Sequence, residues 1–132
     1  MTLRTLLPAG WPKPRGYANG MAATGRLVVT AGVVGWDTKG HFPDGLTAQC
    51  VQTFANIVAI LAEGGAAPSD IVRLTWYITS RADYLAQGKA IGAAYREAFG
   101  THYPAMAVVE VSNLVEAAAM VEIEATAVVA EG

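Results

Sequence analysis

Apolar residues recur along the chain with two different periods, and each period predicts a different kind of element. Between Leu46 and Glu63 the spacings are four, four, three and four residues, which places the apolar residues on one face of a helix. Two glycines follow directly, as is typical of a helix end. We predict a helix over 46–63 with one buried stripe, formed by Leu46, Cys50, Phe54, Ile57 and Leu61.

A second helical pattern runs from about Asp83 to Phe99 and stops at Gly100. Glycines at positions 88 and 92 indicate either close packing of the backbone or a weakened helix. The stripe expected to face the core consists of Tyr84, Gly88, Ile91, Tyr95 and Phe99.

Alternation of apolar and polar residues predicts the strands. In the last of them Val121 and Ile123 share one face, so Glu122 and Glu124 share the other. The first two are short and separated by a turn containing Gly25, which predicts a hairpin. The expected strands cover about 17–22, 26–31, 71–79, 105–111 and 120–130.

The order of these elements, β-β-α-β-α-β-β, predicts an α+β fold with a mixed sheet and both helices on one face. The face that carries the glutamates is then left to water or to another subunit. Residues 1–15 hold three of the six prolines and are expected to be extended or irregular. We expect residues 1–132 to form a single domain.

Composition favours an oligomer and disfavours nucleic acid as a partner. Hydrophobic residues make up 53% of the chain and charged residues 15%, so part of the surface is expected to be covered by another subunit. A net charge of -2 leaves no basic patch for phosphate contacts. No apolar run suggests a signal sequence or a membrane span, so we predict a cytoplasmic protein without a membrane partner.

Common catalytic and cofactor motifs are missing from the sequence. It contains no GxGxxG, P-loop, GxSxG or HExxH pattern. The single cysteine, Cys50, lies on the apolar stripe of the first helix and is expected to be a small buried hydrophobe. His41 and His102 lie in separate loops without the spacing of metal ligands. We therefore predict no metal site and no cofactor.

Several short segments, taken in order, resemble the RidA (YjgF) family of small enamine and imine deaminases. The resemblance extends from about Tyr17 to Val129, and its specificity lies in the joint order of the segments. They are Gly16 and Tyr17, VVTAG at 28–32, Ala48 and Gln49 with Asn56, DIVRLTWYIT at 70–79, YPA at 103–105, VEV at 109–111 and VEIEATAV at 121–128.

The resemblance implies a fold like that of the small trimeric chorismate mutases, a homotrimer with clefts between subunits, and hydrolysis of amino-acid-derived enamines or imines. It also implies an arginine directly after the Pro-Ala step that binds the substrate carboxylate. In this chain that position is Met106. Gly92 and Val108 stand where the family commonly has asparagine and cysteine. The chain therefore resembles a divergent member.

Other family positions are kept. The resemblance implies that Glu122 positions the hydrolytic water, that Tyr17 lines the cleft, and that the Gly32 backbone faces the ligand. Loss of the arginine predicts weak binding of simple imino acids, because methionine donates no hydrogen bond. Two further residues, Trp36 and Arg15, are candidates for contacts with a larger or aromatic ligand.

Each candidate also has a plain structural interpretation. Glu122 could belong to a solvated or interface face, Tyr17 to a subunit seam, Trp36 to a cap on the core, and Met106 to the core itself. His102 is expected to be a surface residue.

Three hypotheses remain for the function. The first is a RidA-like hydrolase that acts on a specialised enamine or imine rather than on 2-aminoacrylate, with Met106 against an apolar part of the ligand. The second is a non-catalytic ligand-binding or chaperone-like trimer. The third, an endoribonuclease, is disfavoured by the acidic charge balance.

Overall fold

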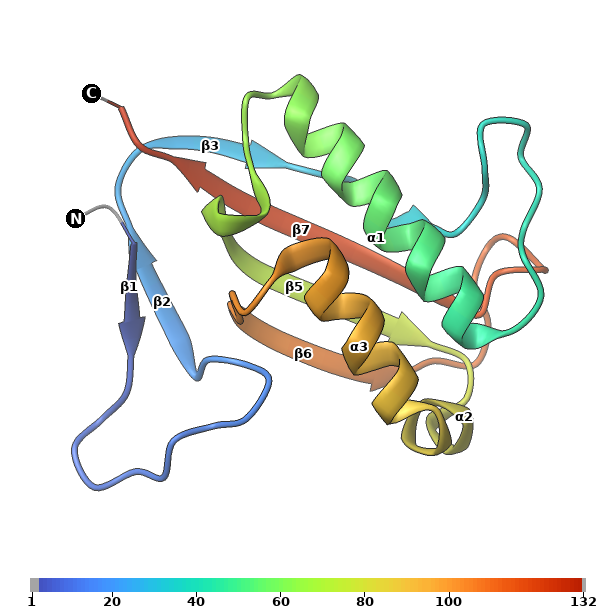
Figure 1. Ribbon diagram of the computed structural model, residues 1–132, viewed down its shortest axis with the longest axis horizontal. Helices are drawn as coiled ribbons and strands as arrows, with labels where there is room; N and C mark the ends of the chain where they lie inside the picture. Colours follow the sequence, from blue (N-terminus) through green and yellow to red (C-terminus); the bar gives the residue numbers. More distant parts are fainter. Residues whose placement is uncertain (1–2, 132) are drawn as a thin grey trace.

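The computed structural model describes residues 3–131, which form a mixed sheet with three helices packed against one of its faces, and a separate two-stranded sheet beside it (Figure 1). The α+β fold predicted from the element order is confirmed. The strands are β1 (Leu3–Leu6), β2 (Gly20–Ala23), β3 (Arg26–Val29), β4 (Val33–Val34), β5 (Ile71–Ile78), β6 (Ala105–Glu110) and β7 (Val121–Val129). The helices are α1 (Leu46–Glu63), α2 (Arg81–Ala86) and α3 (Gly88–Phe99), with a 3-10 turn at Pro68–Asp70.

The main sheet has the strand order β3-β7-β5-β6, and β4 also pairs with β7. Strands β5 and β6 run parallel, whereas β7 is antiparallel to β3, β4 and β5. Between β3 and β4, Thr30 continues the contact with β7, because its N–H donates to the Ala125 carbonyl (2.9 Å) and its Oγ1 accepts from the Ala125 N–H (3.0 Å). The long strand β7 thus carries two short strands along one edge.

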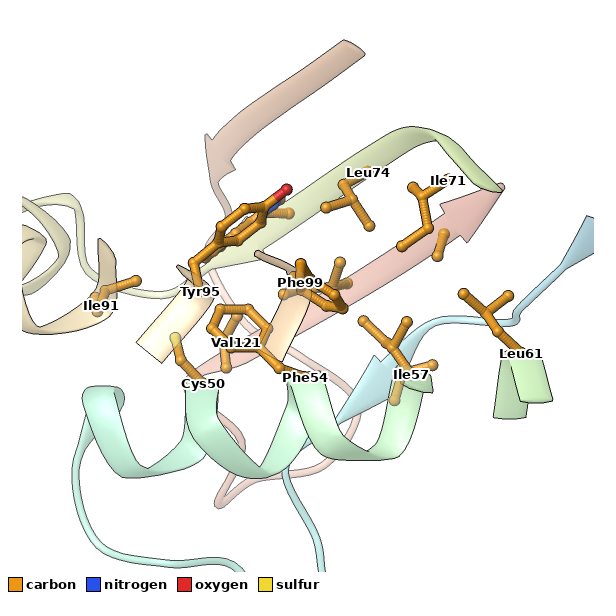
Figure 2. Packing of buried hydrophobic residues seen from close by; sticks show 14 of the residues in the cluster. Cys50, Phe54, Ile57, Leu61, Ile71, Leu74, Ile91, Tyr95, Phe99 and Val121 are labelled. Carbon is orange, nitrogen blue, oxygen red and sulfur yellow. The ribbon is translucent and has the colours of Figure 1, made fainter. Parts of the chain in front are cut away.

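The core lies between this sheet and helices α1 and α3 (Figure 2). Helix α1 has the predicted bounds, and its stripe is fully buried from Leu46 to Leu61. Phe54 lies at the centre, with its ring edge-on to Trp76 (5.4 Å), Tyr95 (5.9 Å) and Phe99 (5.2 Å). Each such pair stabilises the fold by about 0.5–1.5 kcal/mol, in addition to the stabilisation that comes from burying its apolar area.

Helix α1 is also long and apolar enough to cross a membrane by length and composition, contrary to the expectation from the sequence. In this fold it packs with its apolar stripe on β7, β4 and α3. It is the core helix of the domain, and core helices commonly pass the same test.

The predicted hairpin is wrong. β2 pairs with β1, from Gly20 opposite Leu6 to Ala23 opposite Leu3, while β3 pairs with β7. The segment expected to be extended or irregular, 1–15, includes the extended strand β1. The two short strands on either side of Gly25 belong to different sheets, because each finds its hydrogen-bonding partner far from the turn.

The second predicted helix is divided into two helices at Gln87. Ser80 is the N-cap of helix α2, and its hydroxyl accepts a hydrogen bond from the Asp83 N–H (3.1 Å). At the break, the Gln87 Oε1 accepts from both the N–H (3.1 Å) and the hydroxyl (2.6 Å) of Thr47 in the first turn of α1. The break is therefore fastened to α1.

Candidate functional site

A large open cleft, with a volume of about 1070 Å³, lies along the β6 edge of the main sheet. One wall comes from β1, β2 and the N-terminal segment that joins them, and the other from α3 and the loop that follows it. Tyr17, Arg15 and Met106 all line this cleft, so three of the predicted ligand contacts lie in one hollow.

Tyr17 is brought to Met106 by the pairing of its neighbour with the start of β6. The Ala18 N–H donates to the Pro104 carbonyl (2.9 Å), and Ala18 forms a parallel bridge with Ala105. Both Ala18 and Pro104 are buried. This short parallel contact attaches the N-terminal segment to the sheet, while Tyr17 itself stays 44% exposed at the cleft.

Met106 lies on the helix side of the sheet. It is paired with Leu74, a core residue, and together with Val108 it packs against the core cluster from its half-buried position. It is therefore partly core filler and partly cleft lining, and both interpretations from the sequence apply. The Met106 and Val108 side chains make the cleft floor apolar at this point, and neither can donate a hydrogen bond.

An aromatic pair forms another part of the cleft. Tyr95 stacks on Tyr103 with ring centroids 5.3 Å apart and planes 11° apart, and its hydroxyl donates to the His102 carbonyl (2.6 Å). Burial raises the pKa of Tyr95, with a smaller contribution from Tyr103. The His102 Nε2 lies 2.7 Å from the Ile71 carbonyl oxygen and, because a carbonyl can only accept, its N–H donates this hydrogen bond. These contacts give both residues structural roles.

Trp76 contributes an unusual polar group to the same region. The residue is 3% exposed and lines the cleft, and its Nε1 is buried without a hydrogen-bond partner among residues 3–131. Leaving such a donor unpaired costs about 1–3 kcal/mol. Its ring packs edge-on against Tyr84 (6.0 Å), and burial raises the pKa of Tyr84.

The charges in the cleft have one sign. Lys13, Arg15 and Arg96 line it, and no aspartate or glutamate of the described chain does so. The ion pair found among residues 3–131 joins Arg26 to Glu131, away from this cleft. The cleft is thus apolar at its floor and positive at its walls.

A second cluster of predicted site residues lies on the opposite face of the sheet. Glu122 is paired with Tyr77 on β5, whose side chain points away from the core. The Glu122 carboxylate lies directly over Gly32: a Cβ added there would lie 2.1 Å from Oε2 and 2.8 Å from the carboxyl carbon. Only glycine leaves room for the carboxylate in this position.

The carboxylate of Glu124, on the same face of β7, already accepts a hydrogen bond from within the chain. Glu124 Oε1 accepts a hydrogen bond from the Tyr77 hydroxyl (2.5 Å), and this bond is the main cause of a raised pKa of Tyr77. Among residues 3–131, no such donor is found for the Glu122 carboxylate. Of the two glutamates, Glu122 is the one whose oxygens remain available to a water molecule or a ligand.

Within one chain the sheet separates these two clusters. Tyr17, Arg15 and Met106 lie on the helix side, whereas Glu122 and Gly32 lie on the other.

Among residues 3–131, no group of three His, Cys, Asp or Glu side chains is placed to hold a metal ion.

Trp36 belongs to neither cluster. It is 43% exposed just beyond β4, with its ring 6.0 Å from Phe42. The Asn56 side chain donates to the carbonyls of Val34 (2.9 Å) and Trp36 (2.8 Å), so α1 fixes the path of this loop. The predicted ligand contact of Trp36 therefore has no support from the cleft of a single chain.

Similarity to known proteins agrees with this geometry. A sequence model described as Endoribonuclease L-PSP matches residues 12–129. The chain belongs to the RidA (YjgF) family. It is 33% identical over 118 residues to a RutC family protein of Pyrococcus abyssi, covering 88% of this chain and 89% of that protein. It is 32% identical over 108 residues to the 2-iminobutanoate/2-iminopropanoate deaminase of Salmonella typhimurium, covering 79% of this chain and 80% of that enzyme.

A solved structure from the same family is also similar throughout. The Rid family protein YyfB of Yersinia pestis, a protein of unknown function, superposes with a TM-score of 0.85 at 31% identity, covering 98% of this chain and all of that chain. The family assignment and the RidA-like fold predicted from the sequence are both confirmed.

Sequence reasoning missed part of the cleft, namely Lys13, Trp76, Tyr84 and Arg96. The sequence pattern predicted only a core-facing stripe for Tyr84, and it predicted no cleft position for Lys13, Trp76 or Arg96. A signal for Arg96 was present, because it follows Gly92 by four residues and therefore lies above it on the same face of α3.

Proposed function

We propose that the protein hydrolyses an enamine or imine, releasing ammonia and a carbonyl compound. The single observation that carries this proposal is the Glu122 carboxylate, which is held over Gly32 while its neighbour Glu124 is engaged by Tyr77. Membership of a family that includes 2-iminobutanoate/2-iminopropanoate deaminases supports the reaction class.

Glu122 would act on water. In its ionised form it accepts a proton from a water molecule as the water oxygen attacks the carbon of the C=N bond, and the proton then passes to the nitrogen. Collapse of the resulting amino alcohol forms the C=O bond and expels ammonia, so that imine and water give carbonyl compound and ammonia. An enamine first takes up a proton on carbon and loses one from nitrogen, which gives the imine.

The complete site would lie between subunits. Glu122 and Gly32 from one chain would meet the cleft of Tyr17 and Met106 from another, because the sheet keeps the two clusters apart within a chain. Exposed apolar side chains on the outer face, Leu27 (65%), Val29 (58%) and Val109 (43%), suit burial in such an assembly. We infer a homotrimer, as is typical of the family, in the cytoplasm.

The substrate would differ from 2-aminoacrylate. Met106 stands where the resemblance places a carboxylate-binding arginine, and with Val108 it presents an apolar floor. Removing a hydrogen bond to a charged group costs about 1.5–3 kcal/mol, so a small imino acid should bind roughly ten to a hundred times more weakly. An imine with an apolar group beside the reacting carbon fits this floor better.

The proposal is tested by ammonia release from a panel of imines generated in situ by an amino-acid oxidase. We expect turnover of imines with large apolar side chains, and a loss of about a hundredfold or more in Glu122→Gln. Glu124→Gln is the matched control, because it removes a carboxylate from the same face of the same strand. Equal activities of wild type and Glu122→Gln would refute the role of Glu122, and ammonia release no faster than the spontaneous hydrolysis of every imine would refute the hydrolase.

A non-catalytic ligand-binding trimer is the second candidate, favoured by the absence of any carboxylate among the described residues that line the cleft. Saturable binding of apolar ligands without ammonia release would support it. RNA cleavage, which the description of the family model names, is disfavoured by the net charge of -2.

A further inference from the structure

Arg96 lies on α3 at the wall of the cleft, where its guanidinium is within reach of a bound ligand. It lies on the cleft wall one helical turn beyond Gly92, and its Nη1 lies 3.5 Å from the point that a Cβ on Gly92 would occupy. The glycine therefore leaves the helix surface bare beneath the guanidinium. A side chain that lies along its own helix in this way loses less rotamer freedom when a ligand binds.

This guanidinium has no anionic partner in the described part of the chain. No carboxylate of residues 3–131 lies within ion-pairing distance of Arg96, and the residues that line the cleft include no aspartate or glutamate. Its neighbour Glu97 faces a different surface groove, between α1 and α3. The positive charge is therefore not neutralised from within the described part of the fold.

Two more cations line the other wall of the cleft. Lys13 and Arg15 come from the segment between β1 and β2, while Arg96 comes from a helix packed on the core. Like charges on the apolar walls of a cleft concentrate the field inside it and attract anions. Of the three, Arg96 has the most rigid support and the planar donor geometry that matches a carboxylate.

We propose that Arg96 binds the carboxylate of the ligand and so replaces, from the helix side of the cleft, the cation that is missing at position 106. Lys13 and Arg15 strengthen the field from across the cleft. Met106 and Val108 hold the apolar part of the same ligand. The ligand class is an organic acid with an apolar body between its carboxylate and the group that lies on β6.

This inference deepens the proposed function and rests on it for the identification of the ligand as a substrate. It assigns an imine or enamine that carries both an apolar group and an acid group. It also changes one expectation from the sequence, namely that loss of the arginine leaves the ligand without an anchor for an acid. The binding of the acid group can be measured without any turnover.

The test uses 3-phenylpropionate as the probe and 3-phenylpropanamide as its neutral counterpart, with binding to the full-length protein followed by calorimetry at low salt. We expect the acid to bind more tightly than the amide to wild type. Arg96→Gln should weaken binding of the acid about ten- to a hundredfold and leave binding of the amide within about twofold. Arg96→Lys, which keeps the charge without the planar fork, should lie between them.

Lys89→Gln provides the matched control, because Lys89 is a cation on the same helix that does not line the cleft. Equal weakening in Lys89→Gln and Arg96→Gln, equal affinity of wild type for acid and amide, or no binding of the acid would each overturn the proposal. If Arg96 selects the acid but no imine is hydrolysed, the inference stands and the hydrolase falls. If imines are hydrolysed but Arg96→Gln leaves acid binding unaffected, the hydrolase stands and the inference falls.

Discussion

The two faces of the main sheet differ in charge and in how firmly their polar groups are held. On the outer face, Glu122 is fitted over Gly32 and Glu124 is bonded to Tyr77. On the helix side, the cleft has an apolar floor at Met106 and cations with no carboxylate of residues 3–131 beside them. The two glutamates and the cleft thus lie on opposite sides of the main sheet.

Under the proposed function, this difference would allow a divergent relative to change its ligand and keep its reaction. The outer face is constrained by a single close approach, since any side chain at position 32 displaces the carboxylate. The cations that line the cleft, Lys13, Arg15 and Arg96, are exposed and can change with little effect on the core, whereas Trp76 and Tyr95 in the same lining are buried. We therefore expect the carboxylate to be the fixed part of the site and the cleft to be its variable part.

The largest effect is expected when one variant inactivates the outer face, a second variant blocks the cleft, and the two are mixed. Glu122→Gln should inactivate the carboxylate of each chain, and Gly92→Phe should block the cleft with a large ring where Arg96 lies. In the proposed intersubunit site Glu122 comes from one chain and the cleft from another, so oligomers assembled from an equal mixture should recover roughly one quarter of wild-type turnover.

The measurement is ammonia release after joint unfolding and refolding of the two inactive variants, with each variant refolded alone as the control. Size-exclusion chromatography should show that all samples assemble equally. A mixture as inactive as its parents, in oligomers of normal size, would place the whole site within one chain.

Gly32→Ala tests the fixed face more gently. The added methyl group must push the Glu122 carboxylate aside, because it would approach Oε2 to 2.1 Å. We expect turnover to fall by about tenfold or more, while binding of the acid probe in the cleft stays unchanged. Turnover equal to wild type in a stably folded Gly32→Ala protein would mean that the position of this carboxylate is unimportant.

A smaller effect is expected in the core between the sheet and helices α1 and α3. Burial raises the pKa of the Cys50 thiol from 9.0 to about 12. Between these values the unfolded chain binds fewer protons than the folded chain, so this residue makes the free energy of unfolding decrease as pH rises. Below about pH 9 the thiol is neutral in both states and contributes no such slope.

Cys50→Ala should therefore show a flatter decline of stability between about pH 9 and 11 than wild type, although it is less stable at about pH 7 because it loses a buried sulfur. Urea unfolding at several pH values measures both quantities. Parallel stability profiles for the two proteins would show that the folded thiol ionises as readily as a free one.

The sequence predicted the elements that form from neighbouring residues, namely helix α1 and strands β5 and β7. The period of α1 and the glycines after Glu63 give its bounds, and strict alternation gives β5 and β7 to within a residue or so. The pairing of β1 with β2 was not predictable in this way, because it joins segments separated by a proline-containing loop. The break at Gln87 depends on its contact with Thr47, forty residues away.

Three of the predicted site residues, Tyr17, Arg15 and Met106, lie together in the cleft, but their separation from Glu122 did not follow from the sequence. Strand parity correctly placed Glu122 apart from Val121 and Ile123 on β7, and the same alternation puts Met106 and Val108 on one side of β6. Parity does not say which side of β6 faces the helices, so the separation of Met106 from Glu122 by the sheet was not foreseen. Arg96 was missed because its significance lies in the charge of the surrounding cleft.

The central claim is that Met106 directs the cleft away from small imino acids, and Met106→Arg tests it most directly. The measurement compares wild type and Met106→Arg in the hydrolysis of 2-iminopropanoate generated from alanine by an amino-acid oxidase, with melting temperatures recorded for both. We predict slow turnover by wild type and an increase of about tenfold or more in Met106→Arg, since a charge-assisted contact to the carboxylate is restored. Rapid turnover by wild type, with no gain in a folded Met106→Arg protein, would contradict the account.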